Sequence, residues 1–169
     1  MTRDTTRWRL RDAQQTEQIG AALCAALRPG DFIGLSGPLG AGKTCITRGI
    51  LAGLRPEPGH DVSSPTYTLM NHYKAQAPFV RVLHADLYRL EDMDDLESTG
   101  YWDAIEEADL ALVEWIDKLP AAWPREGFDL RLDYDQGQTR SLELRWRGAG
   151  GQARLEVARA RINALLGAP

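Results

Sequence analysis

The most constraining feature of this 169-residue chain is the segment 37–44, which fits the pattern G-x-x-x-x-G-K-[ST]. This pattern is typical of loops that bind nucleotide phosphates. Upstream, Phe32 to Leu35 form a short apolar run that predicts a buried strand. Downstream, apolar residues recur at helical spacing at Ile46, Ile50, Leu51 and Leu54. The segment therefore lies between a strand and a helix, as a phosphate-binding loop must.

Each residue type in this segment has a physical role. The three glycines, Gly37, Gly40 and Gly42, permit backbone conformations and close approaches that a Cβ atom would block. Successive backbone N–H groups can then point at an anion, at the positive end of the following helix. We expect Lys43 to reach the outer phosphates as a point charge and the Thr44 hydroxyl to coordinate Mg²⁺.

The whole loop and the residue after it are expected to bind the nucleotide: Gly37, Pro38, Leu39, Gly40, Ala41, Gly42, Lys43, Thr44 and Cys45. Pro38 lacks a backbone N–H, so it removes one donor from the first half of the loop. The later donors remain.

Composition favours one soluble globular domain spanning residues 1–169. The net charge of −4 argues against a large electrostatic footprint for nucleic acid. The first 11 residues lack an apolar secretion segment, and no apolar run approaches the roughly 20 residues of a membrane span. We therefore expect a cytosolic protein without a membrane partner.

The first half of the chain alternates predicted helices and strands. Asp12 is expected to cap a helix with Gln15 as its capping-box partner, and Pro29-Gly30 ends that helix. A cluster of helix breakers at 55–59 follows the loop helix. The next predicted strand runs from Phe79 to Asp86.

The second half begins with one or two short acidic helices over 91–108 and a buried strand at 110–113. Alternating apolar residues then predict an antiparallel hairpin over 128–146, with a turn at 135–139. An amphipathic helix over 155–165 follows, and its arginines Arg154, Arg159 and Arg161 are expected to form its solvated side. The predicted fold class is α/β: a P-loop NTPase-like sheet with a parallel core, flanking helices and a C-terminal antiparallel hairpin.

Two carboxylates end predicted strands, where ligands bind in parallel sheets. Glu114 follows four apolar residues and fits best as the acid that holds the metal or its water shell; Asp86 fits nearly as well. One can bind metal while the other orients water or acts as general base, and the sequence does not assign these roles. The alternative for each is an acid that caps a turn.

Three further positions lie near these carboxylates. Ser64-Pro65-Thr66 stands where nucleotide switches place a hydroxyl that senses the γ-phosphate, although it is also ordinary turn chemistry. Trp115 can pack on the nucleotide, face a partner or fill the core. His84 precedes Asp86 by two residues, so both share a strand face; a structural and a catalytic role remain open for it.

Taken together, these motifs resemble the TsaE (YjeE) family. The matching pieces are the phosphate loop, S-P-T-Y-T-L at 64–69, H-A-D-L-Y-R-L at 84–90 and V-E-W at 113–115. Their order and spacing match across residues 12–120. This combination is far more specific than the phosphate loop alone, which many families share.

The resemblance implies an ATPase that uses ATP and Mg²⁺ and serves the synthesis of threonylcarbamoyladenosine in tRNA. It implies binding to a TsaB–TsaD complex, so that tRNA is contacted indirectly. By position, Lys43 and Thr44 handle phosphates and Mg²⁺, Glu114 is the metal ligand and Asp86 the second essential acid. Thr66 belongs to the switch-like segment, Trp115 lies near the nucleotide, and Arg140 is a candidate contact to nucleotide or partner.

Three other functions compete with this interpretation. A small-molecule kinase of the P-loop class needs an arginine-rich lid, whereas the arginines after Glu114 alternate along the predicted hairpin. A GTPase is disfavoured because the guanine-reading N-K-x-D pattern is absent. The third is an interaction module whose ATP site only holds one conformation. It differs from the ATPase only in how fast ATP is hydrolysed.

Overall fold

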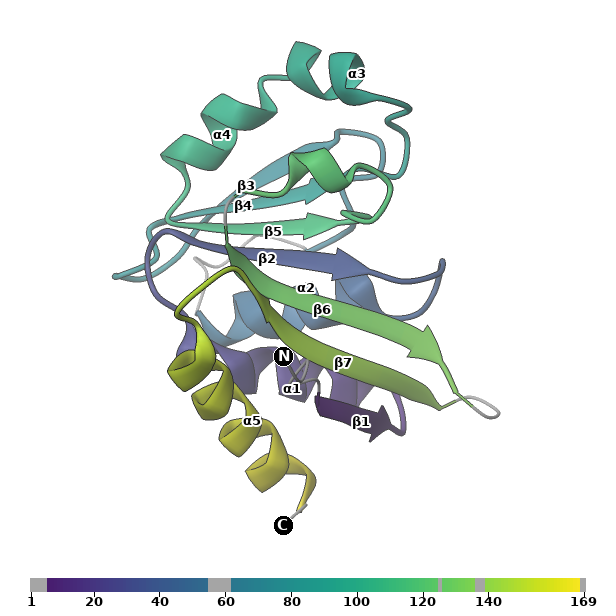
Figure 1. The fold of residues 1–169 in the computed structure, drawn as a ribbon, viewed down its shortest axis with the longest axis vertical. Coiled ribbons are helices and arrows are strands. Elements are labelled where there is room, and N and C mark those ends of the chain that lie inside the picture. Colours follow the sequence, from purple (N-terminus) through teal and green to yellow (C-terminus); the bar gives the residue numbers. More distant parts are fainter. Residues whose placement is uncertain (1–5, 55–61, 125, 136–138, 168–169) are drawn as a thin grey trace.

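A seven-stranded sheet forms the centre of the computed structural model, which describes residues 6–54, 62–124, 126–135 and 139–167 (Figure 1). The strand order is β1-β7-β6-β2-β5-β4-β3. The strands are β1 (Thr6–Leu10), β2 (Asp31–Ser36), β3 (Met70–Lys74), β4 (Arg81–Asp86), β5 (Leu110–Glu114), β6 (Gly127–Tyr134) and β7 (Arg140–Arg147).

The centre of the sheet is parallel and its margins are antiparallel. Strand β2 pairs in parallel with β5 and with β6, and β5 pairs in parallel with β4. Strand β3 pairs antiparallel with β4, β7 with β6, and β1 with β7. The carboxyl ends of β2, β4 and β5 therefore meet at one edge of the sheet.

Helices cover the sheet on both faces. Helices α1, α2 and α5 lie on one side, and α3 and α4 lie on the other beside β3, β4 and β5 (Figure 1). Their bounds are α1 (Ala13–Leu23), α2 (Lys43–Gly53), α3 (Met93–Ser98), α4 (Tyr101–Glu107) and α5 (Gln152–Leu166). Short 3₁₀ turns occupy η1 (Cys24–Ala26) and η2 (Pro120–Ala122).

Alternation along the central strands divides the core in two. Ile33 and Leu35 of β2 point toward α1, α2 and α5 and join the larger hydrophobic cluster. Phe32 of the same strand joins the second cluster, which includes residues of α3 and α4. Both faces of β2 are thus buried, which is why its sequence is a continuous apolar run.

The predicted α/β class, parallel core and C-terminal hairpin are confirmed. The Asp12 carboxylate caps α1 by accepting from the Gln15 N–H at 2.7 Å, as expected, but the Gln15 side chain reaches back to the N–H of Arg11 instead of that of Asp12. Strands β1 and β3 were not predicted. The predicted breaker cluster at 55–59 and the turn centre at 136–138 lie outside the described residues.

The prediction that all three arginines of the last helix form its solvated side is wrong for Arg154. Its guanidinium donates to the Asp31 carboxylate and to the Ala26 carbonyl, and only 16% of its side chain is exposed. It also lies over the rings of Phe128 and Trp146. Arg154 thus joins the start of α5 to the start of β2, because the two ends lie side by side in the fold.

Candidate active site

The phosphate-binding loop connects β2 directly to α2. Gly37, Gly40 and Gly42 all have positive φ angles, of 128°, 76° and 112°. A Cβ atom at Gly37 would lie 1.9 Å from the carbonyl oxygen of Leu132 on the neighbouring strand β6. The loop can therefore take this path only with glycine at that position.

Lys43, the first residue of α2, folds its side chain back over the loop. Its ammonium donates to the carbonyls of Gly37 at 2.6 Å and Pro38 at 2.9 Å, and it lies 3.7 Å from the centre of the Trp115 ring. Burial lowers the pKa of Lys43, while Glu114 and other nearby carboxylates oppose that shift. Loop carbonyls and an aromatic face thus hold this cation at the sheet edge.

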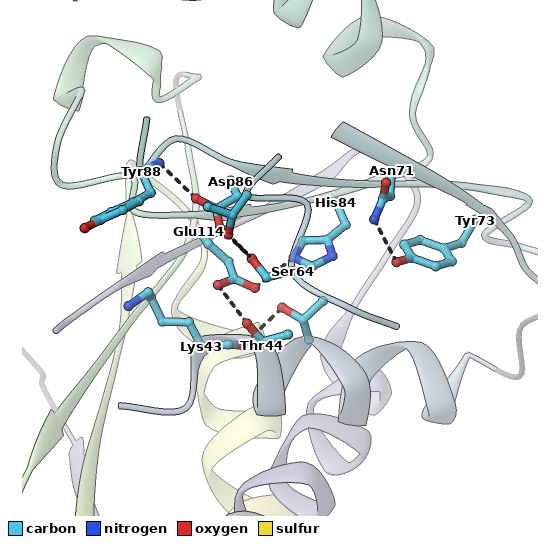
Figure 2. Close-up of polar contacts among 11 residues, drawn as sticks. Lys43, Thr44, Ser64, Asn71, Tyr73, His84, Asp86, Tyr88 and Glu114 are labelled. Carbon is cyan, nitrogen blue, oxygen red and sulfur yellow. Dashed lines mark hydrogen bonds and ion pairs between the residues drawn. The ribbon is translucent and has the colours of Figure 1, made fainter. Parts of the chain in front are cut away.

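Glu114, the last residue of β5, lies between Thr44 and His84 (Figure 2). Its Oε2 accepts from the Thr44 hydroxyl at 3.1 Å, and its Oε1 lies 2.8 Å from Nε2 of His84. The residue is only 2% exposed. A buried carboxylate needs such partners, because an unpaired charge away from water is costly.

Asp86 ends the adjacent strand β4 and pairs in register with Glu114. Its Oδ2 accepts from the hydroxyls of Ser64 at 2.5 Å and Thr66 at 2.7 Å, and its Oδ1 accepts from the Tyr88 backbone N–H at 2.9 Å (Figure 2). The switch-like segment is therefore attached to this carboxylate by two side-chain hydrogen bonds.

Trp115 follows Glu114 with a positive φ of 60°, an uncommon conformation for a bulky residue. Its ring packs on Tyr88, with ring centres 4.8 Å apart, and faces the Lys43 ammonium. The turn aims the indole back over the phosphate loop, so backbone strain here coincides with the predicted site.

These groups line one cavity of about 240 Å³ at the carboxyl edge of the parallel strands. The loop contributes Leu39, Gly40, Gly42, Lys43, Thr44 and Cys45, and the other elements contribute Ser64, Thr66, Asp86, Tyr88, Glu114 and Trp115. A larger cavity of about 370 Å³ lies between α4 and the β3–β4 pair. Its lining includes Arg81, at the opposite end of β4 from Asp86, so this cavity is distinct from the one that the predicted site residues line.

The remaining predicted residues lie close by. Gly37, Pro38 and Ala41 belong to the loop without lining the cavity. Arg140, at the start of β7, also does not line it; its Cδ atom would lie 3.6 Å from a Cβ placed on Gly42. Arg140 therefore lies beside the loop, on the side of the hairpin.

Sequence reasoning left three contacts unassigned. His84 holds Glu114, Tyr88 packs on Trp115, and the Tyr134 hydroxyl donates to the Leu39 carbonyl at 2.6 Å. The positions of His84 and Tyr88 within the 84–90 motif were a signal for the first two. No local sequence pattern predicted the contact of Tyr134, because Tyr134 and Leu39 lie 95 residues apart in the sequence and meet only in the folded chain.

The donor set suits Mg²⁺. Within the described ranges no group of three or more His, Cys, Asp or Glu side chains forms a cage that could hold a metal on its own. Magnesium bound with a nucleotide takes most ligands from phosphates and water, and the protein supplies one or two oxygens. The adjacent Thr44 hydroxyl and Glu114 carboxylate meet that requirement.

Comparison with known proteins identifies the family of this chain. A family model described as "Threonylcarbamoyl adenosine biosynthesis protein TsaE" matches residues 10–142, most of the chain and every element around the cavity. The chain belongs to the TsaE family. It is therefore a P-loop nucleotide-binding protein of tRNA threonylcarbamoyladenosine biosynthesis.

Individual relatives agree. The chain is 39% identical over 112 residues to the TsaE protein of Haemophilus influenzae, a match that covers 65% of this chain and 66% of that relative. It is 34% identical over 139 residues to TsaE of a Nostoc species, covering 80% and 82% of the two chains. The crystal structure of Bacillus subtilis YdiB has the same fold, with a TM-score of 0.70, 24% identity and 95% of each chain covered.

No helix in the part of the TsaE chain that the structure describes has the length and apolar character to cross a membrane.

The two cysteines of this TsaE protein should differ in reactivity. Cys45 lines the cavity, whereas Cys24 donates to the Ile50 carbonyl, and burial raises the pKa of its thiol to about 11. At pH 8 only about one Cys24 thiol in a thousand is then the reactive thiolate. We expect iodoacetamide to modify Cys45 first and added ADP to slow that reaction, as measured by peptide mass spectrometry. Preferential modification of Cys24, or no protection by ADP, would contradict the expectation that a nucleotide binds in this cavity over Cys45.

Proposed function

We propose that this protein is a Mg-ATP-dependent ATPase that supports tRNA threonylcarbamoyladenosine modification by acting on a TsaB–TsaD complex. The supporting observation is the convergence of Lys43, Thr44, Asp86 and Glu114 on one cavity at the carboxyl ends of three parallel strands. These are an ammonium, a hydroxyl and two carboxylates, the groups that phosphoryl chemistry uses.

In this proposal the loop from Gly37 to Cys45 binds the phosphates through its backbone N–H groups, and Lys43 neutralises their outer charge. Thr44 and Glu114 hold the metal. Bound Mg²⁺ would supply charge stabilisation on the phosphate oxygens. Trp115 packs against the bound nucleotide, and Arg140 contacts it from the side of the hairpin.

Asp86 and Thr66 are the proposed catalytic partners of Lys43. The Asp86 carboxylate lines the cavity and makes no hydrogen bond to Thr44, so it suits orientation or deprotonation of the attacking water. Its hydrogen bonds to Ser64 and Thr66 also attach it to the switch-like segment, residues 63–69. Movement of those hydroxyls on nucleotide binding would change that segment, and we propose that the change is what a partner detects.

The proposed partners are TsaB and TsaD homologues in the cytosol, with tRNA contacted through that complex. The net charge of −4 supports an indirect contact with tRNA. Because the switch-like segment is on the surface, with Tyr67 exposed, a protein bound there could respond to the state of the site.

Reconstitution tests this function. ATP hydrolysis by the protein should be slow alone and rise when TsaB, TsaD and tRNA are present, together with modified tRNA in excess over the complex. The measurements are phosphate release and nucleoside mass spectrometry from the same reactions. Hydrolysis that the partners do not change would contradict the proposed role. Phosphorylation of a metabolite by the isolated protein would favour the small-molecule kinase instead.

A further inference from the structure

His84 is the most deeply buried ionisable side chain beside the site. It lies on β4 two residues before Asp86, with no exposed surface, and shares its strand face with Asp86. Its Nε2 lies 2.8 Å from Oε1 of Glu114, on the next strand. A carboxylate only accepts hydrogen bonds, so the ring proton in this contact belongs to Nε2.

The surroundings of His84 leave Glu114 as its polar partner. One face of the imidazole stacks near Tyr73, with ring centres 6.4 Å apart and 29° between the planes. The other ring nitrogen, Nδ1, is buried without a hydrogen-bond partner among the described residues. The ring is fully buried, and its Nε2 contacts the Glu114 carboxylate of the neighbouring strand (Figure 2).

This contact sets how the Glu114 carboxylate is oriented relative to the nucleotide loop. With Oε1 held by His84, Oε2 points to the Thr44 hydroxyl at 3.1 Å. A free glutamate side chain has several rotamers, so holding one oxygen from behind reduces the entropy lost when the other binds a ligand. Partners behind a metal ligand commonly act in this way.

We propose that His84 is the positioning residue for Glu114, which it orients so that Oε2 and Thr44 together receive Mg²⁺. The inference rests on the proposed Mg-ATP function. A purely structural histidine would stabilise the fold without affecting how strongly Mg²⁺ enhances nucleotide binding. The two roles can therefore be separated by measuring that enhancement.

The experiment compares the affinity for a non-hydrolysable ATP analogue with Mg²⁺ and with EDTA, by calorimetry on the full chain. In His84→Leu we expect the enhancement by Mg²⁺ to fall by about tenfold or more, while the affinity in EDTA stays near wild type. His84→Gln keeps an N–H donor that can reach Glu114 and should restore most of the enhancement. His84→Asn is too short to reach and should resemble His84→Leu.

Two controls keep the result interpretable. His72→Leu makes the same change at an exposed histidine on β3 and should leave the enhancement unchanged. Thermal unfolding identifies any variant that fails to fold. If His84→Leu does not fold, the comparison of His84→Gln with His84→Asn still tests the positioning role.

The possible results distinguish failure of the positioning role of His84 from failure of the proposed Mg-ATP function. Full Mg²⁺ enhancement in folded His84→Leu or His84→Asn would overturn the positioning role, as would equal loss in the Gln and Asn variants. If the wild-type protein itself shows no enhancement by Mg²⁺, the proposed Mg-ATP function fails instead.

Discussion

Replacing Lys43 with alanine is expected to weaken ATP binding by about 10- to 100-fold. A hydrogen bond to a charged group contributes roughly 1.5–3 kcal/mol, and about 1.4 kcal/mol corresponds to a tenfold change in affinity. Lys43 is 4% exposed, and its ammonium already lies at the loop, where it donates to the Gly37 and Pro38 carbonyls. Calorimetry with ATP and with ADP measures the loss, which should be larger for ATP.

Lys118→Ala is the matched control for this change. Lys118 is an exposed lysine near the same cleft, where its ammonium donates to the Tyr88 carbonyl outside the phosphate loop. Its removal should change ATP affinity little, because exposed charges are well screened by solvent. Equal affinities in the wild-type and Lys43→Ala proteins would refute the assignment of the loop.

The grouping of the candidate site residues could largely be predicted, because most of them lie at or just after strand ends. The loop motif fixed a strand before Gly37 and a helix after it, and the apolar runs before Asp86 and Glu114 identified two more strands. Parallel pairing then brings those ends together at one sheet edge, as the register of β4 with β5 shows. The roles of the two carboxylates could not be predicted, because they depend on side-chain partners from distant segments.

The two edge strands were missed for different physical reasons. In β3, Asn71, His72 and Lys74 give a polar segment whose strand character comes from its pairing with β4. In β1, Trp8 and Leu10 are buried and alternate with exposed arginines, but five residues are a weak pattern. Its partner β7 lies more than a hundred residues away in the sequence.

Arg154 and His84 illustrate contacts that the sequence pattern cannot resolve. Helical periodicity placed Arg154 on the polar side of α5, which is correct for an isolated helix but ignores Asp31, which lies beside it in the fold. For His84 the spacing to Asp86 gave the strand face, yet only the adjacent strand β5 supplies Glu114. In both residues the decisive partner comes from a different part of the chain.

Asp86→Asn is expected to lower the rate of ATP hydrolysis by about 10²–10⁴-fold while leaving ATP bound, because a positioned general base contributes an effect of that size. The asparagine keeps a side-chain oxygen that can accept from Ser64 and Thr66, so the local structure should survive. What it loses is the negative charge that, in the proposed function, orients or deprotonates the attacking water. Single-turnover hydrolysis with the partner complex and calorimetric ATP affinity measure the two effects separately.

Asp117→Asn controls for the loss of one negative charge near the loop. Asp117 is exposed, and its charge, like that of Asp86, acts to raise the pKa of Lys43, but it does not line the cavity. Its substitution should leave hydrolysis close to wild type. If Asp86→Asn hydrolyses ATP at the wild-type rate, Asp86 only holds the switch-like segment through Ser64 and Thr66, and another residue acts as the general base. If both variants lose activity equally, the cause is the loss of one negative charge near the loop. Loss of a positioned base would lower activity only in Asp86→Asn, because Asp86 lines the cavity and Asp117 does not.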